Sequence, residues 1–166
     1  MALAPAAYAT AFTAADMNIV VYPDGSISAT FGNSGIAAGE FTDTFSFTIA
    51  ADGTGSGSVT TSTSSFHLPT DLDLWDVTVN SLPTTANSGP GLIEFAGISN
   101  VPITAFVLNV VTIHGWSYGN GSYGANATFV PAAVPEVATW AMMLVGFGAA
   151  GAGLRYQRRS TKIAFS

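Results

Sequence analysis

The sequence predicts an all-β protein: an antiparallel β-sandwich or jelly-roll-like domain followed by a single C-terminal transmembrane helix. Three observations lead to this prediction. Apolar residues alternate with polar ones from about residue 17 to 130, and β-branched and aromatic types dominate there. Clusters of Gly, Pro and Asn interrupt the pattern about every dozen residues, as in sandwiches and barrels. An uncharged segment, 138–154, then precedes a cluster of arginines.

The expected strands are short and are bounded by turn-forming residues. They cover residues 17–22, 26–31, 40–50, 56–68, 74–80, 92–97, 103–116 and 122–130. Residues 32–35 (GNSG) are expected to form a turn between strands. The segment 56–68 is rich in Ser and Thr; a flexible linker is the alternative there, but the β propensity of Thr favours a strand with two polar faces.

Charged residues are few and segregated along the chain. All ten acidic residues lie before position 137 and all four basic residues lie after position 154, for a formal net charge of −6. A body without Lys or Arg cannot neutralise phosphates, so we expect no nucleic-acid partner. The chain has no cysteine, which excludes disulfides, thiolate nucleophiles and Cys-based zinc sites.

Composition shifts divide the chain into five segments. Residues 1–15 are expected to be the remnant of a signal peptide with an N-terminal segment, because Ala7-Tyr8-Ala9 has the small-x-small pattern of a signal-peptidase site. A frayed Ala-rich terminus is the alternative. The sandwich domain is assigned to 16–130, a proline-containing linker to 131–137, the transmembrane helix to 138–154, and a basic cytoplasmic tail to 155–166.

The tail has the length and charge of a short membrane segment. A helix over 138–154 is roughly 25 Å long at ~1.5 Å per residue, near the lower limit for crossing a hydrocarbon layer of about 30 Å. Trp140 and Tyr156 suit the two interfaces, and Arg155 begins the basic cluster that favours a cytoplasmic C-terminus. The prolines before the segment and the arginines after it argue against a core helix. Physical reasoning alone leaves a permanent anchor and a removable label both open.

The end of the chain, VPEVATWAMMLVGFGAAGAGLRYQRR, resembles the PEP-CTERM sorting signal of its PEPxxWA subtype, which occurs in Gram-negative bacteria. Val137 stands where that signal has its second proline. The resemblance implies export, transient retention in inner-membrane lipid, and processing by an exosortase, a membrane cysteine protease. It also implies a final location at the cell surface or in an exopolysaccharide-containing biofilm matrix. The residues that carry the match are Pro135, Glu136, Trp140, Ala141, Arg155, Arg158 and Arg159.

A second motif lies in the body, where Phe41, Asp43 and Phe45 form the sequence FTDTF. It resembles the FxDxF motif of a family of PEP-CTERM proteins. The alternation of the strand 40–50 places these three residues on one face. We expect Asp43 to be a buried structural carboxylate that accepts hydrogen bonds from backbone amides, with a ligand-binding role as the alternative.

Among the other polar and aromatic residues, the sequence predicts no catalytic residue, no metal ligand and no cofactor-binding residue. Asp71, Asp73 and Asp76 are close in sequence, as in a calcium site, but a solvated turn is the favoured interpretation. His67 and His114 lie in no recognisable nucleophile motif. The protein is therefore expected to be a non-enzymatic structural or surface protein. The alternative is a carbohydrate-binding module that stacks exopolysaccharide on aromatic rings, with these candidates: Trp75, Trp116, Tyr118 and Tyr123.

Overall fold

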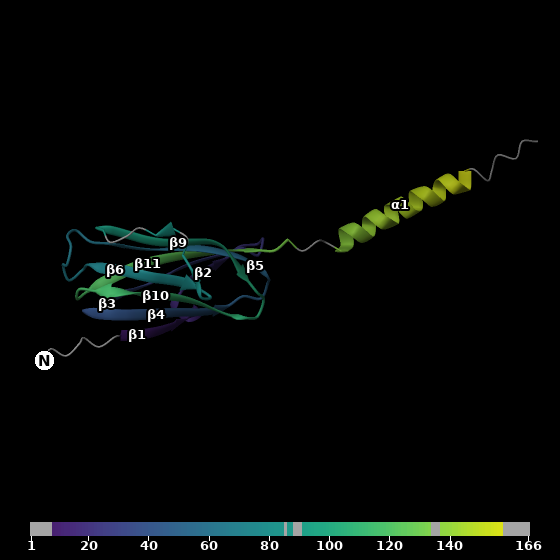
Figure 1. The fold of residues 1–166 in the computed structure, drawn as a ribbon. Helices are drawn as coiled ribbons and strands as arrows, with labels where there is room; N and C mark the ends of the chain where they lie inside the picture. Colours follow the sequence, from purple (N-terminus) through teal and green to yellow (C-terminus); the bar gives the residue numbers. More distant parts are fainter. Residues whose placement is uncertain (1–7, 85, 88–90, 134–136, 158–166) are drawn as a thin grey trace, which may run out of the picture. The chain divides into compact units, whose positions relative to one another are not determined.

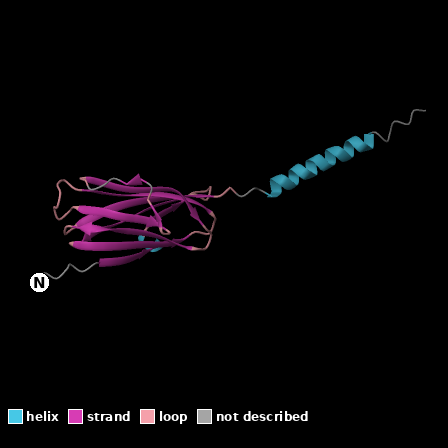
Figure 2. Cartoon of the chain, in the orientation of Figure 1, coloured by secondary structure: helices cyan, strands magenta, loops and turns pink. Residues whose placement is uncertain are grey.

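The computed structural model describes residues 8–84, 86–87, 91–133 and 137–157. The chain divides into two compact units, Met1–Ala132 and Ala133–Ser166, each of which is described by itself. The first unit is built of β-strands and the second contains a helix (Figures 1 and 2). The β unit consists of two sheets packed face to face, which confirms the predicted β-sandwich.

The first sheet, sheet A, has the strand order β1-β4-β10-β6-β7 within the described residues. Strand β1 runs parallel to β4, and the other pairs are antiparallel. A short 3₁₀ turn, Ala14–Asp16, follows β1. The strand bounds are β1 (Tyr8–Thr13), β4 (Gly39–Thr48), β10 (Leu108–Ser117), β6 (Leu72–Val79) and β7 (Leu82–Pro83).

The second sheet, sheet B, has the order β2-β3-β11-β5-β9-β8 and is antiparallel throughout its described pairs. Its strands contain more Ser, Thr and Gly than the strands of sheet A. The strand bounds are β2 (Asn18–Val21), β3 (Ile27–Ile36), β11 (Gly121–Pro131), β5 (Gly53–Ser62), β9 (Ile93–Ile103) and β8 (Ala86–Asn87).

The core follows from the alternation of the strands. Phe41 and Phe45 of β4 and Ile113 of β10 are almost completely buried, because they point from sheet A into the space between the sheets. The alternation predicted for residues 40–50 is thereby confirmed. Phe45 is the centre of an aromatic cluster in which Phe12 and Phe31 each lie 4.5 Å away between ring centroids.

The structure corrects several sequence-based boundaries. The sandwich begins upstream of residue 16, since β1 pairs along β4 and places Phe12 against Phe45. Residues 32–35 form part of β3 instead of a turn, because their backbone pairs with β11. The expected strand 103–116 is interrupted after Ile103, where Phe106 adopts a left-handed backbone with φ of 60°.

The Ser/Thr-rich segment is a strand, as predicted, but it is shorter than predicted. Strand β5 ends at Ser62, and residues 66–68 lie in turns instead of continuing it. His67 there has a φ of 59°, outside the range of regular extended backbone. The outward positions of β5 form a hydroxyl row that is continued on β11 by Asn126, which donates to Ser58 Oγ at 3.1 Å.

The second unit contains helix α1 (Val137–Gln157), and side chains are described over its residues 140–156. Within the described residues, no helix is both long enough and apolar enough to cross a membrane. The segment predicted as a transmembrane helix is therefore confirmed as a helix, and its assignment as a membrane span is not supported.

Strand β6 contains a β-bulge opposite Gly115 of β10. His114 pairs with Asp76 while Gly115 pairs with Leu74, so that Trp75 is the extra residue. A Cβ at position 115 would overlap the Asp73 carbonyl oxygen and would lie 3.0 Å from the ring of Phe41. The bulge can therefore form only where β10 has no side chain.

We predict that Gly115→Ala lowers the free energy of unfolding by about 1–3 kcal/mol, the usual effect of an overpacked core. Urea denaturation followed by circular dichroism measures it. The matched control is Gly124→Ala in β11, where an added Cβ meets no atom within 4 Å. This control should change stability by less than about 0.5 kcal/mol. Equal losses of unfolding free energy from the two substitutions would contradict the close approach of Gly115 to the Asp73 carbonyl oxygen.

Candidate functional site

Asp43 lies in the interior and connects the two sheets. Its side chain is 1% exposed, and its Oδ2 atom accepts hydrogen bonds from the Tyr123 hydroxyl at 2.6 Å and from Asn33 Nδ2 at 2.8 Å. Asp43 belongs to sheet A, whereas Tyr123 and Asn33 belong to sheet B. The prediction that Asp43 is buried is confirmed, but its described donors are side chains of the opposite sheet instead of the expected backbone amides.

The two phenylalanines of the motif enclose this contact. Phe45 packs on Phe12 and Phe31, and the ring of Phe41 stacks on Tyr123 at 6.1 Å between centroids. Burial, with the Asp43 carboxyl as hydrogen-bond partner, raises the pKa of the Tyr123 hydroxyl far above its ordinary range. Tyr123 therefore remains a donor, which satisfies the buried carboxylate without any cation.

Glu94 of β9 makes the reverse connection, from sheet B to sheet A. Its side chain is 2% exposed. Its Oε2 accepts from the Leu74 N–H at 2.8 Å, next to the bulge, and its Oε1 accepts from the Gly91 N–H at 3.0 Å. Burial raises the pKa of the Glu94 carboxyl, and the nearby carboxylates of Asp73 and Asp71 raise it further.

The bulge places aromatic rings on the outer face of sheet A. Trp75 is 50% exposed, and its ring stacks beside that of Trp116 with 6.1 Å between centroids and 23° between planes. The His114 ring meets Trp75 edge-on at 5.3 Å. Three strands thus contribute to one aromatic surface, since Glu40 of β4 places its Oε1 atom 2.9 Å from His114 Nε2 and accepts a hydrogen bond when that nitrogen carries a hydrogen.

Carboxylates surround the two tryptophans. In the register of the sheet, Trp116 lies between Glu40 of β4 and Asp73 of β6, and Asp76 lies opposite His114. Asp73 Oδ2 accepts from the Tyr118 hydroxyl at 3.2 Å, and burial together with the Asp73 charge raises the pKa of that hydroxyl. We call this surface the aromatic face; it comprises Glu40, Asp73, Trp75, Asp76, His114 and Trp116.

The structure separates the four aromatic residues that are candidates for the alternative, sugar-binding function. Trp75 and Trp116 lie side by side on the aromatic face, and Tyr118 borders it through Asp73. Tyr123 is 5% exposed and belongs to the core, because it alternates inward on β11. Three of the four candidates are thus brought together.

The remaining candidates are dispersed. Asp71 is 2% exposed and its Oδ2 accepts from the His67 N–H at 2.6 Å, so the favoured prediction of a solvated turn is wrong for this residue. Among the described residues, no group of three or more His, Cys, Asp or Glu side chains is placed to hold a metal ion. His114 does pair with an acid, but on an open sheet face.

The sorting-signal residues lie in or next to α1. Trp140, Ala141 and Arg155 are in the helix, and all are exposed. The other four lie outside the described residues: Pro135, Glu136, Arg158 and Arg159.

Sequence reasoning missed Glu94 and the partners of Asp43. Glu94 shares one face of its strand with Ala96 and Ile98, as Asp43 does with Phe41 and Phe45, so the same pattern marks both carboxylates. Asn33 was assigned to a turn, and Tyr123 is 80 residues from Asp43. No local pattern in the sequence connects residues at that separation.

The fold and the aromatic face define a β-sandwich with an exposed, acidic aromatic surface. The chain matches no protein-family model, and a search of curated proteins found no match. It is similar to the pre-peptidase C-terminal domain of a collagenase from Bacillus anthracis, at 13% identity and a TM-score of 0.37 over 74% of this chain and 94% of that one. It is also similar to a periplasmic inhibitor of g-type lysozyme from Aeromonas hydrophila, PliG, at 11% identity and a TM-score of 0.32 over 75% and 98%. A third similar structure is the insecticidal crystal protein Cry2Aa, at 15% identity and a TM-score of 0.33. The match covers 70% of this chain and 19% of that one.

We predict that Tyr123→Phe lowers the free energy of unfolding by about 1–3 kcal/mol, because it removes a donor from a buried carboxylate. Chemical denaturation of the full chain measures the loss. The control is Tyr22→Phe, since Tyr22 is 49% exposed. This substitution should lower the free energy of unfolding by less than about 0.5 kcal/mol. If the two variants were equally stable, the hydrogen bond from Tyr123 to Asp43 would not stabilise the fold.

Proposed function

We propose that this chain is an exported, non-enzymatic protein of the bacterial envelope or biofilm matrix, and that its tail is a PEP-CTERM-type sorting signal. The observation that carries this proposal is the segregation of charge: an acidic β domain, an uncharged helical segment, and a basic end. By the positive-inside rule, this order suits a chain whose body is translocated and whose terminal arginines are not. The FxDxF motif in the same chain adds support.

In this proposal the apolar tail holds the chain at inner-membrane lipid until an exosortase cleaves near Pro135 and Glu136. The division of the chain after Ala132 supports a removable tail, since the strands of the sandwich among the described residues all lie before residue 132. The domain would therefore keep its core after cleavage. Val137, at the first position of α1, is where the signal departs from the family pattern.

The test is the mature C-terminus, determined by mass spectrometry after expression in an exosortase-containing bacterium. We expect an end near Pro135-Glu136, with the chain uncleaved when the exosortase gene is deleted. Val137→Pro should raise the cleaved fraction and Trp140→Asp should abolish cleavage. An intact chain recovered from the cytosol, or cleavage that is independent of the exosortase, would refute the proposal.

The aromatic face favours a second function, binding of exopolysaccharide. The apolar C–H face of a pyranose ring packs on an aromatic side chain, and sugar hydroxyls donate to carboxylates. Trp75 and Trp116 offer two adjacent rings, and Glu40, Asp73 and Asp76 are adjacent acceptors. This face has three carboxylates and no Lys or Arg, so the polysaccharide it suits is neutral rather than anionic.

Gel retardation in the producing organism's exopolysaccharide tests this second function. Trp75→Ala or Trp116→Ala should weaken binding at least tenfold, because each removes one ring of the pair. Tyr22→Ala, which removes an exposed ring that is not part of the aromatic face, should leave retardation unchanged. Unretarded migration of the unaltered chain would refute binding, as would equal retardation of all variants.

A further inference from the structure

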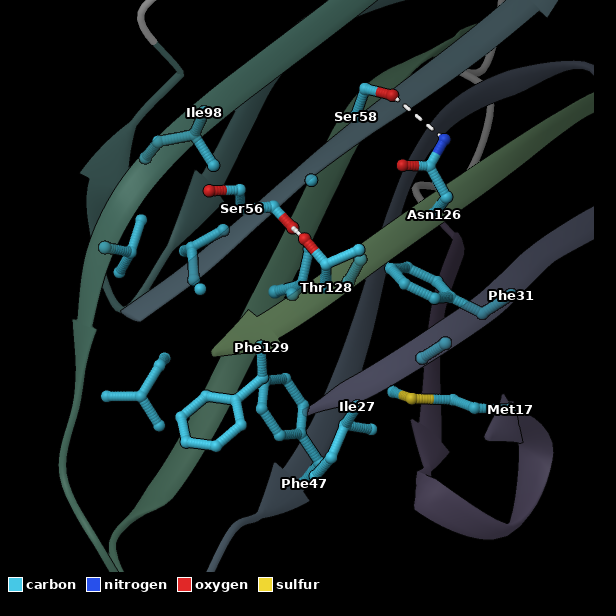
Figure 3. A pocket seen from close by; sticks show the side chains of 18 of the residues that line it. Met17, Ile27, Phe31, Phe47, Ser56, Ser58, Ile98, Asn126, Thr128 and Phe129 are labelled. Atoms are coloured by element: carbon cyan, nitrogen blue, oxygen red, sulfur yellow. Dashed lines mark hydrogen bonds between the residues drawn. The ribbon is translucent and has the colours of Figure 1, made fainter. Parts of the chain in front are cut away.

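An apolar cavity lies between the two sheets of the sandwich. Its volume is about 290 Å³, and its lining side chains come from both sheets. Figure 3 shows Met17, Ile27, Phe31, Phe47 and Phe129 gathered around it. The buried core is correspondingly divided into two clusters, of which the smaller consists of Val101, Ile103 and Phe129.

Small residues of sheet B leave this space unfilled. One row of paired residues crosses five strands in the order Ile19, Ala29, Ala127, Gly57 and Ile98, and each of the five lines the cavity. The middle three positions have a methyl group or no side chain. At Gly57 an added Cβ would lie 2.6 Å from the Asn126 carbonyl oxygen, so the row cannot be filled there.

The same row gives the cavity its direction. Adjacent strands lie ~4.8 Å apart, so the four intervals from Ile19 to Ile98 span roughly 19 Å. Ile19 belongs to the edge strand β2 and is 40% exposed, which places one end of the row at the surface. Inward-facing Ala29 and Ala127 remain half-buried although they lie in inner strands. An extended chain fits such a space better than a compact ring system.

A cavity with this lining favours an apolar occupant. Interiors pack with few voids larger than a water molecule, whereas apolar cavities of about 150 Å³ remain dry and take up benzene or xenon. The volume here is about twice as large. An apolar ligand would restore the contacts that the lining side chains lack.

The acidic charge of the sandwich limits which head group the ligand can carry. No Lys or Arg occurs before residue 155, and the sandwich is acidic. Four charged residues lie within five positions of the row in sequence, and all are acidic: Asp16, Asp24 and Asp52, which are exposed, and Glu94, which is buried. A fatty-acid carboxylate at the mouth would thus meet repulsion and no cation.

We propose that the sandwich binds one uncharged long-chain lipid, such as a fatty alcohol or ester, with its unbranched chain between the sheets along the row from Ile19 to Ile98. This site is separate from the aromatic face and does not depend on the sorting of the chain.

The experiment is displacement of the uncharged dye N-phenyl-1-naphthylamine from the full-length chain by 1-dodecanol or by dodecanoate at pH 8. Saturable displacement by dodecanol is expected, with dodecanoate at least tenfold weaker. Ala29→Leu places a side chain in the cavity and should weaken dodecanol binding at least tenfold. Thr30→Leu places the same side chain on the outer face of β3, where Thr30 is exposed, and should change binding by less than twofold.

The matched pair also separates the cavity from the apolar tail, because the tail is unchanged in both variants. If Ala29→Leu does not fold, as judged by circular dichroism, Ala127→Leu tests the neighbouring position in the same row. The proposal is overturned by absence of saturable binding to the unaltered chain, by an unchanged affinity in the folded cavity variant, or by dodecanoate binding as tightly as dodecanol.

Discussion

The hydrogen bonds to Asp43 are the interaction on which the rest of the sandwich depends. A buried carboxylate is costly unless it is paired, and the β domain contains no Lys or Arg to pair with it. Tyr123 and Asn33 therefore supply the donors, and both must come from the opposite sheet because Asp43 points inward from β4. Glu94 makes one contact in the reverse direction, since it accepts from the Leu74 N–H of sheet A; its second donor, the Gly91 N–H, lies just before its own strand. Asp43 thus bonds from sheet A to sheet B, and Glu94 bonds from sheet B to sheet A. Together the two carboxylates restrict how the sheets align.

The outer faces of the two sheets differ in the side chains that they present to solvent. The central strands of sheet B, β3, β11 and β5, present mainly short hydroxyl and amide side chains, and Asn126 bonds to Ser58 there. Sheet A presents the Trp75–Trp116 pair, and it does so because the β6 bulge adds one residue opposite Gly115. The same bulge brings the Leu74 N–H to Glu94. The buried connection between the sheets and the exposed aromatic surface therefore share one local irregularity.

Much of the fold could be predicted from the sequence, since burial in a sandwich imposes a period of two on each strand. That period correctly placed Phe41, Asp43 and Phe45 on the inner face. It failed at residues 32–35, where Gly and Asn suggested a turn although pairing with β11 holds them in a strand. The period of two also did not predict β1, whose sequence is rich in alanine, as in a leader segment. Only the packing of Phe12 on Phe45 shows that this segment belongs to the sheet.

The sequence by itself determined the β class of the body, the inward position of the FxDxF side chains, the helix after residue 137 and the separation of acidic from basic residues. These are properties of local spacing and composition, so neighbours along the chain are sufficient to specify them. Only the tertiary structure decided which donors reach Asp43, that Trp75 and Trp116 lie together, and that Ala29, Ala127 and Gly57 leave one continuous cavity. Each of these depends on the register between strands that are distant in sequence, and register is fixed only when both sheets pack against each other.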